Sequence, residues 1–358
     1  MSQRMIDQFM EMVRIDSESG EEARMMEYLL GAVASAGGRA ELDAYGNLIG
    51  RFPALGCTGV APVLLSCHGD TVKPGKGIRP ILSGGVIRSS GDTILGADDK
   101  AGIAEVLEAM RVSTVRPPIE LAVSRQEETG LQGVKSLDFS KLSAKRGFLM
   151  DNDTLETIVI GGPSYFAIDV EITGKAAHAG MEPEKGINAI YAAARAIAAL
   201  SLGRLDGETT ANVGIIEGGI IRNGVPAKCT FKAECRSAVH EKAALLAEEM
   251  EGTIRRAVEA AGAKVTIAID NMCRAVRIPE ASWTVDVAKS ALKTVGVDAR
   301  AVFITGFTDA SIYNNKGIEM AVIGIGAQNE HSTDECIAVA DMEKAVKALV
   351  EMLRIAAA

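Results

Sequence analysis

Apolar positions recur every three or four residues in two stretches near the N-terminus, and this period predicts two amphipathic helices. The first covers "MSQRMIDQFMEMVRIDS", where acids are interspersed among the apolar side chains. The second places Met25, Leu29 and Val33 on one face. Ser19 and Glu22 have the spacing of a capping box, so we expect the second helix to begin at that motif.

The next part of the chain consists of short apolar runs separated by glycine and polar residues, which is typical of strands. One further helix is predicted over 99–111. The strand-like runs are "LDAYGNLIGRF", "APVLLSCHGDTV", "GGVIRSSGD", "PPIELAVSRQEE" and "KRGFLMDND". Strands that alternate with helices predict an α/β fold of three layers, in which helices cover both faces of a sheet.

From Ser164 the pattern changes to longer strands with regular alternation of apolar and polar positions. The order strand, helix, strand, strand, helix, strand is that of the ferredoxin-like split βαβ fold. The α/β pattern returns after Pro279. We therefore expect residues 164–274 to form an α+β domain inserted into a first domain made of residues 1–163 and 275–358.

Length and charge narrow the possible functions. A chain of 358 residues is long enough for two domains. The formal net charge of −9 argues against a nucleic-acid partner, because an acidic protein does not neutralise phosphates. No apolar run reaches the roughly 18 residues of a membrane span, and the first helix is too acidic for a secretory signal. The six cysteines form no CxxC pair, so we expect reduced thiols and a cytoplasmic protein.

Five apolar runs of the α/β segments end in acids or a histidine. Because the carboxyl ends of the strands form one rim of an open α/β sheet, these side chains are expected to meet there. They are His68 and Asp70 in "LLSCHGD", Asp98 and Asp99 in "ILGADDKAG", Glu127 and Glu128 in "SRQEETG", Asp151 in "FLMDND" and His331 in "NEHSTDE". Each stretch alone is also typical of a loop or a helix N-terminus. Their joint occurrence, with two of the four histidines, favours a metal site.

Imidazole and carboxylate ligands predict Zn²⁺, with Mn²⁺ or Co²⁺ as alternatives. The number of ligands favours two ions, because two divalent cations balance three carboxylates and a hydroxide. Asp70 lies two residues after His68 and can orient its imidazole. The doubled glutamate then has a purpose, since one carboxylate can bind metal while the other takes a proton from water. The sequence alone leaves open which glutamate does which.

These motifs together resemble those of the M20 family of metallopeptidases, and within it the peptidase T-like branch. The matching stretches are "SCHGDTV", "LGADDKAG", "RQEETG", "MDND", "GKAAHAGMEPEKGINA", "GGIIRNGVPAKCTFKAECRS", "GFTDAS" and "EHSTDE". They occur in the family's order and span residues 66–335. The resemblance implies a zinc-peptidase-like catalytic domain and, in residues 164–274, a lid domain through which two subunits can pair.

The resemblance also implies a set of metal ligands. Asp98 would bridge two ions and be joined to Asp99 by a cis peptide bond. The other ligands would be His68 and Asp151 for one ion, and Glu128 and His331 for the other.

Further roles follow from the same resemblance. Glu127 would be the general base, Asp70 would orient the histidine ligand, and His178 would stabilise the oxyanion from the lid. The substrate-binding residues would be Asn223 and Arg236 in the lid, and Gly306, Thr308 and Asp309 in a loop of the catalytic domain. Asp309 is also the candidate partner of a free amino group.

The expected function is therefore that of a two-metal hydrolase acting on short peptides, most simply an aminopeptidase that releases the N-terminal residue of tripeptides. An N-acyl amino acid deacylase or a carboxypeptidase would use the same fold and metals. A metal-stabilised binding protein is the alternative from another class, but it would have no use for Glu127 as a base. A homodimer formed through the lid is the expected protein partner, with no nucleic acid or membrane involved.

Overall fold

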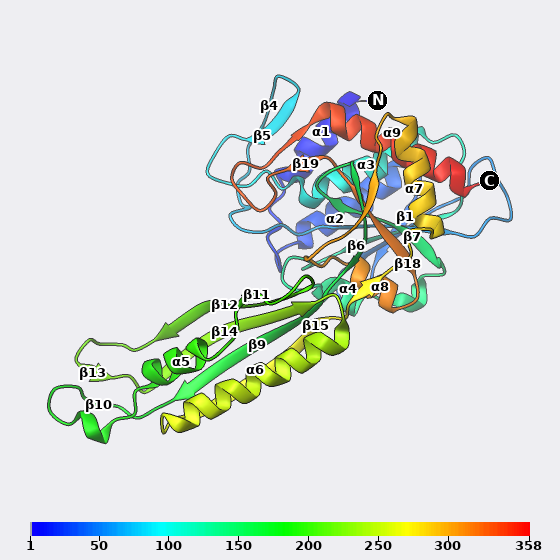
Figure 1. Ribbon diagram of the computed structural model, residues 1–358. Coiled ribbons are helices and arrows are strands. Elements are labelled where there is room, and N and C mark those ends of the chain that lie inside the picture. The colour runs from blue at the N-terminus through cyan, green and yellow to red at the C-terminus, as the bar shows by residue number, and fades with distance from the viewer. Residues whose placement is uncertain (1) are drawn as a thin grey trace. The chain divides into compact units, whose positions relative to one another are not determined.

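The structure, a computed structural model, describes residues 2–358 (Figure 1). The chain folds into two compact units. The α/β unit consists of Met1–Gly161, Arg277–Ile304 and Thr308–Ala358, and the inserted unit consists of Gly162–Val276 and Thr305–Phe307. The sequence analysis put the boundaries at 163/164 and 274/275, and it did not assign Thr305–Phe307 to the insertion.

A nine-stranded sheet forms the centre of the α/β unit, with the order β1-β2-β6-β3-β7-β18-β8-β16 and with β17 paired to β8. The strands are β1 Arg39–Leu42, β2 Leu48–Phe52, β3 Val63–His68, β6 Ile119–Ser124, β7 Arg146–Asn152, β8 Thr157–Gly162, β16 Val276–Arg277, β17 Arg300–Phe303 and β18 Glu319–Gly324. The neighbours β6, β3, β7 and β18 run parallel, so their carboxyl ends lie at one edge of the sheet.

Every residue of β3 and β6 is buried, which requires that both faces of the sheet are covered. The helices of this unit are α1 Ser2–Val13, α2 Ala23–Ser35, α3 Ala97–Val112, α4 Gln132–Ser136, α7 Trp283–Thr294, α8 Ala310–Asn315 and α9 Val339–Ala356. α3 packs on β3 and β7, and both α7 and α8 pack on β18 (Figure 1). The prediction of a three-layer α/β fold is confirmed.

The predicted capping box of the second helix is wrong. α2 follows Glu22, and no side-chain hydrogen bond caps it within residues 2–358. The Glu22 carboxylate accepts a hydrogen bond from Arg125 Nε at 2.9 Å, and Ser19 Oγ donates to Asp70 Oδ2 at 2.7 Å. Ser19 and Glu22 fit the local capping motif, but each forms a hydrogen bond with a residue more than 50 positions away in the sequence.

The inserted unit has the predicted order of strands and helices, and its ferredoxin-like fold is confirmed. Its sheet has the order β11-β12-β14-β9-β15, and all neighbours are antiparallel. The elements are β9 Ser164–Thr173, α5 Ala189–Ala198, β11 Gly203–Arg204, β12 Thr209–Gly218, β14 Lys228–Ser237, α6 His240–Ala260 and β15 Lys264–Cys273. The short β11 was not predicted.

One face of this sheet is covered and the other is open. In β14, buried side chains alternate with more exposed ones. Phe231 and Cys235 point to the covered face and belong to the unit's own hydrophobic core, where α5 and α6 pack on the sheet. Lys232, Glu234 and Arg236 alternate with them and therefore lie in line on the open face.

Smaller elements complete both units. In the inserted unit, β10 Ala177–His178 pairs with β13 Gly224–Val225. A four-stranded sheet of the α/β unit consists of β4 Pro80–Ser83, β5 Val86–Ser89, β19 Ala327–Gln328 and β20 Cys336–Ala338. The 3-10 turns are η1 Phe139–Lys141 and η2 Pro183–Lys185. Among residues 2–358, no helix is long and apolar enough to cross a membrane.

Candidate active site

The carboxyl-end rim of the parallel strands gathers the first group of predicted metal ligands. His68 is the last residue of β3, Asp151 lies near the end of β7, and Asp98 lies in the first turn of α3. His68 Nε2 is 3.0 Å from Asp98 Oδ1 and 3.5 Å from Asp151 Oδ1. The peptide bond between Asp98 and Asp99 is cis.

A second group meets on the other oxygen of Asp98. His331 Nε2 lies 3.1 Å from Asp98 Oδ2 and 2.9 Å from Glu128 Oε1. Asp98 is therefore shared by two histidines, one on each of its oxygens. All five predicted ligands thus belong to one cluster, although they come from five separate stretches of the chain.

This donor set fits divalent cations. His68, Asp98 and Glu128 can bring ligand atoms within 4.8 Å of one another, and so can His68 with Asp99 and Asp151. Buried carboxylates this close repel one another unless positive charge balances them. The buried Asp99 Oδ1 accepts no hydrogen bond from any residue within 2–358. An oxygen atom that lacks a hydrogen-bond donor is free to bind metal.

Asp70 fixes the loop that carries the doubled glutamate. Its two oxygens accept hydrogen bonds from the backbone N–H groups of Glu127 at 3.0 Å and Glu128 at 3.2 Å. Its Oδ1 also lies 3.4 Å from His68 Nδ1. Burial opposes ionisation of Asp70, but His68 and the hydrogen bonds from Ser19 and Glu127 hold its pKa below the usual value. One carboxylate therefore positions a histidine and both glutamates.

Replacing Ser19 with alanine is expected to lower the free energy of unfolding by about 1.5–3 kcal/mol, because the change removes a hydrogen bond to a buried, charged carboxylate. Urea unfolding measures this loss. Ser35→Ala is the matched control, since Ser35 Oγ donates to the neutral Ala32 carbonyl at the end of α2. Its expected cost is only about 0.5–1.5 kcal/mol. Equal losses in both variants would contradict the role given to Ser19.

Glu127 lies in a loop with unusual backbone geometry. The preceding Gln126 has a φ of 52°, in the left-handed region that few residues other than glycine adopt. The Glu127 side chain is 7% exposed. Burial, followed by the charge of Asp151, raises the pKa of Glu127 well above its usual value. A carboxyl group with a raised pKa can exchange a proton near neutral pH.

The sequence analysis missed Glu335, which fixes the start of α3. The Glu335 carboxylate accepts hydrogen bonds from the Gly96 N–H at 2.6 Å and the Asp98 N–H at 3.0 Å. It belongs to the same "EHSTDE" stretch as His331, whose φ of 60° marks a tight loop. The acid at the end of that stretch was the available signal, but sequence could not show that it binds backbone rather than metal.

Thr308 and Asp309 lie at the start of α8 in the α/β unit. Ser124 Oγ, at the end of β6, donates a hydrogen bond to Asp309 Oδ2. Burial raises the pKa of Asp309 to about 7. The Asp309 side chain is fully buried, so it supports the rim from within the α/β unit.

His178 and Asn223 are neighbours in the inserted unit, where the Ala179 N–H donates to the Asn223 carbonyl at 3.0 Å. His178 Nδ1 accepts hydrogen bonds from the N–H groups of Gly180 at 3.2 Å and Met181 at 3.1 Å. In a neutral imidazole only one nitrogen carries a proton. Because Nδ1 acts as the acceptor, the proton sits on Nε2, and the exposed ring is a hydrogen-bond donor at Nε2.

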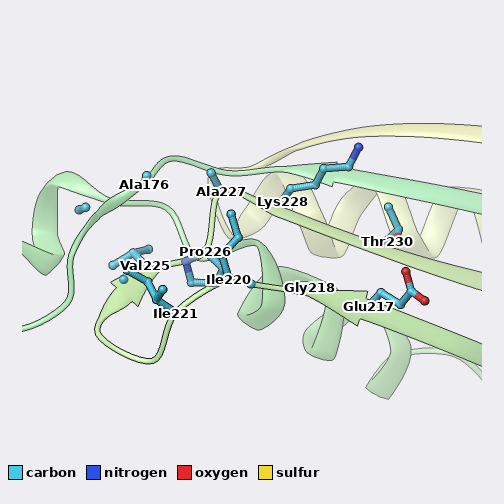
Figure 2. A pocket seen from close by; sticks show the side chains of 13 residues that line it. Ala176, Glu217, Gly218, Ile220, Ile221, Val225, Pro226, Ala227, Lys228 and Thr230 are labelled. Carbon is cyan, nitrogen blue, oxygen red and sulfur yellow. The ribbon is translucent and has the colours of Figure 1, made fainter.

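A cavity of about 680 Å³ lies beside this turn (Figure 2). Ile220, Ile221 and Val225 line it and give it an apolar surface, while Glu217 and Lys228 lie at its margin in the view. The Ile220 side chain is 99% exposed.

Arg236 and the segment around Gly306 are also neighbours in the inserted unit. Arg236 Nη1 donates to the Thr305 carbonyl at 3.2 Å. The Phe307 ring stacks on Tyr165, with centroids 5.1 Å apart. The sequence analysis assigned Gly306 to a loop of the other domain. These two contacts hold its segment on the inserted unit instead, while Thr308 onwards belongs to the α/β unit.

Comparison with known proteins agrees with the site. Residues 163–262 match the peptidase dimerisation domain of the M20 family. The protein YqjE of Bacillus subtilis is 33% identical over 367 residues, covering 99% of this chain and 98% of that protein. Aminopeptidase PepT of Bacillus cereus is 35% identical with a TM-score of 0.89, covering 100% of this chain and 99% of that chain. A tripeptidase of Staphylococcus aureus is 31% identical with a TM-score of 0.93 and the same coverage.

The fold and the cluster of histidines and carboxylates, together with these relatives, define a metallopeptidase with a site for two metal ions. The chain belongs to the M20 family, in its peptidase T-like branch, so the family predicted from the sequence is confirmed. Peptidase T of Fusobacterium nucleatum is 25% identical over 290 residues, covering 78% of this chain and 69% of that protein.

Proposed function

We propose that this protein is an aminopeptidase that releases the N-terminal residue of tripeptides. The observation that carries the proposal is Asp98, whose two oxygens face two different histidines at the centre of a buried acidic cluster. The similarity to an aminopeptidase and to a tripeptidase, over nearly the whole length of each, supports the substrate class.

In this proposal Asp98 would contribute to the binding of both of two divalent ions. His68 and Asp151 would hold one ion, and Glu128 and His331 the other. The mixture of imidazole and carboxylate suits Zn²⁺ best, with Mn²⁺ and Co²⁺ as alternatives. Such ions, when bound, supply a more acidic water molecule and a Lewis acid for the substrate carbonyl.

The chain's own residues then move the proton and hold the substrate. Glu127 takes a proton from the attacking water and passes it to the amine that leaves when the C–N bond breaks. Asp70 keeps Glu127 in place because its carboxylate accepts a hydrogen bond from the Glu127 backbone N–H. His178 donates its Nε2 proton in a hydrogen bond to the carbonyl oxygen as negative charge develops there.

The residues proposed to bind the substrate are Asn223, Arg236, Gly306 and Thr308. The Asn223 amide suits the peptide backbone, and the Arg236 guanidinium suits a carboxylate. Asp309 is fully buried against Ser124. We therefore propose that Asp309 shapes the loop after Gly306 rather than contacts the substrate's amino group.

The test of the proposed function uses one tripeptide in two forms, free and N-acetylated, with protein reconstituted with Zn²⁺, Mn²⁺ or Co²⁺. Mass spectrometry identifies the products. Release of the first residue from the free form only is the expected result. Cleavage of the acetylated form would make the protein a deacylase or a carboxypeptidase and would overturn the aminopeptidase proposal.

We also propose that two copies of this chain pair through the inserted unit, whose family match is a dimerisation domain. Within the described chain, β11 pairs only with Thr210 and Ala211 of β12. The rest of β12 therefore has an unpaired edge, and Ile215 and Ile216 on it are 51% and 50% exposed. A second copy can cover this apolar edge and add hydrogen bonds to it.

Ile216→Asp is expected to turn the dimer into a monomer, because it places a charge at the centre of the proposed interface. Light scattering coupled to size-exclusion chromatography measures the mass. Leu245→Asp is the matched control, since Leu245 is an equally large and 60% exposed side chain on α6, away from β12. A wild-type protein that elutes as a monomer would contradict this proposal.

A further inference from the structure

We propose that Glu234 is a specificity-determining residue, which competes with the substrate's C-terminal carboxylate for Arg236. The inference rests on the proposed function, in which Arg236 is the substrate's carboxylate partner. It concerns a residue that neither the motifs nor the comparisons assign, and all of its contacts lie within the inserted unit.

Glu234 occupies the edge of the Arg236 guanidinium that binds carboxylates best. Arg236 Nε donates to Glu234 Oε1 at 3.2 Å, and Nη2 donates to Glu234 Oε2 at 2.9 Å. Two parallel N–H···O bonds of this kind form the bidentate arrangement in which arginine recognises carboxylates. A peptide carboxylate that uses the same edge must first displace Glu234.

The remaining Nη1 group and the faces of the Arg236 guanidinium also have partners. Nη1 donates to the Thr305 carbonyl at 3.2 Å. The guanidinium carbon lies 4.6 Å from the ring centroid of Tyr165 and 5.5 Å from that of Phe307. These contacts hold Arg236 in a fixed position while Glu234 occupies its Nε and Nη2 groups. Among these partners, Glu234 is the one that a substrate carboxylate can replace with the same pair of hydrogen bonds.

Glu234 and Arg236 form an accessible pair of opposite charges on β14. Glu234 and Arg236 are two residues apart on one strand, so both side chains lie on the open face of the sheet. Their side chains are 25% and 26% exposed, so the pair is accessible to solvent and to a peptide. The negative charge of Glu234 offsets the positive charge of Arg236. A carboxylate on the substrate therefore adds little to the affinity of the wild-type protein for that substrate.

The test compares a tripeptide that has a free C-terminal carboxylate with its C-terminal amide. Glu234→Gln keeps the size of the side chain and removes its charge. We expect this change to lower KM for the free acid by a factor of about 1.4 to 5, the range of an exposed ion pair, and to leave KM for the amide unchanged. In the double variant Glu234→Gln/Arg236→Gln, KM for the acid should no longer fall relative to KM for the amide.

Asp169→Asn is the matched control. Asp169 lies 3.9 Å from Lys232 on the open face of the same sheet and carries the same charge, but it is not a partner of Arg236. Its removal should change neither KM. Glu234→Thr, which suits a strand, is the second charge-free variant if the glutamine variant folds poorly.

Calorimetric binding of the product dipeptide, as acid and as amide, repeats the comparison without turnover. An unchanged ratio of acid to amide in Glu234→Gln, or weaker binding of both forms, would overturn the inference and give Glu234 a structural role. Wild-type protein that does not release the first residue of either tripeptide would instead contradict the proposed function. The two failures are therefore distinguishable.

Discussion

Glu127→Gln is expected to lower the rate of tripeptide hydrolysis by about 10²–10⁴-fold, the usual contribution of a general base. The amide keeps the shape of the side chain but cannot take a proton. In the structure the Glu127 side chain is buried beside the predicted metal ligands, and its backbone N–H donates a hydrogen bond to Asp70. Steady-state kinetics measures the rate, and elemental analysis of the same sample measures bound metal.

The metal content distinguishes Glu127 from its neighbour. Glu127→Gln should keep both ions, because this account gives Glu127 no metal bond. Glu128→Gln should lose an ion, because Glu128 Oε1 lies 2.9 Å from His331 Nε2 in the proposed ligand set. Full activity of Glu127→Gln, or loss of metal from it, would show that the roles of the two glutamates are assigned wrongly.

Asp98→Ala is expected to have the larger effect, with less than one ion bound per chain and a loss of hydrolysis of about 10⁴-fold or more. Asp98 is the residue shared by both histidines, at 3.0 Å and 3.1 Å. Its removal therefore takes a ligand from both sites and leaves the remaining acids without the cations that balance them. Elemental analysis and the tripeptide assay together check this result.

Asp151→Ala is the control for Asp98→Ala, since Asp151 contacts only one of the two histidines within the described residues. It should reduce the metal content by one ion, not by both. If Asp98→Ala still binds as much metal as the wild-type protein, Asp98 is not the bridging residue.

The side chains at the rim of the α/β unit could be predicted from the sequence because the order and direction of the strands place them there. Runs such as Val63–His68 are buried at every position, and such strands are parallel neighbours in an α/β sheet. Side chains that follow them then lie on one rim, whatever their separation in sequence. His68, Glu128 and Asp151 lie at or just after the ends of β3, β6 and β7 for this reason. Asp98 at the start of α3 and His331 in the loop between β19 and β20 join them from outside these strands.

Residues that act through long-range hydrogen bonds could not be predicted in the same way. Ser19 fits a local capping motif, but it donates to Asp70, 51 positions along the chain. Glu335 has the composition of a metal ligand but accepts backbone N–H groups. In both cases the side chain has several chemically reasonable partners, and only the fold decides which of them is within reach.

The unit to which a segment belongs could not always be predicted from the sequence either. Gly306 follows a strand of the α/β unit and precedes one of its helices, so sequence order places it there. The stacking of Phe307 on Tyr165 and the hydrogen bond from Arg236 to the Thr305 carbonyl outweigh that order and bind the segment to the inserted unit. The competition that we propose between Glu234 and a substrate carboxylate likewise rests on two hydrogen bonds from Arg236 to Glu234, which no motif indicated.

The most direct test of the central claim is a metal titration of the stripped wild-type protein, with bound Zn²⁺ and tripeptide hydrolysis measured in the same samples. The account predicts no hydrolysis without metal and full activity only when two ions are bound per chain. Hydrolysis that persists after the metal is removed, or that is complete with a single bound ion, would contradict it.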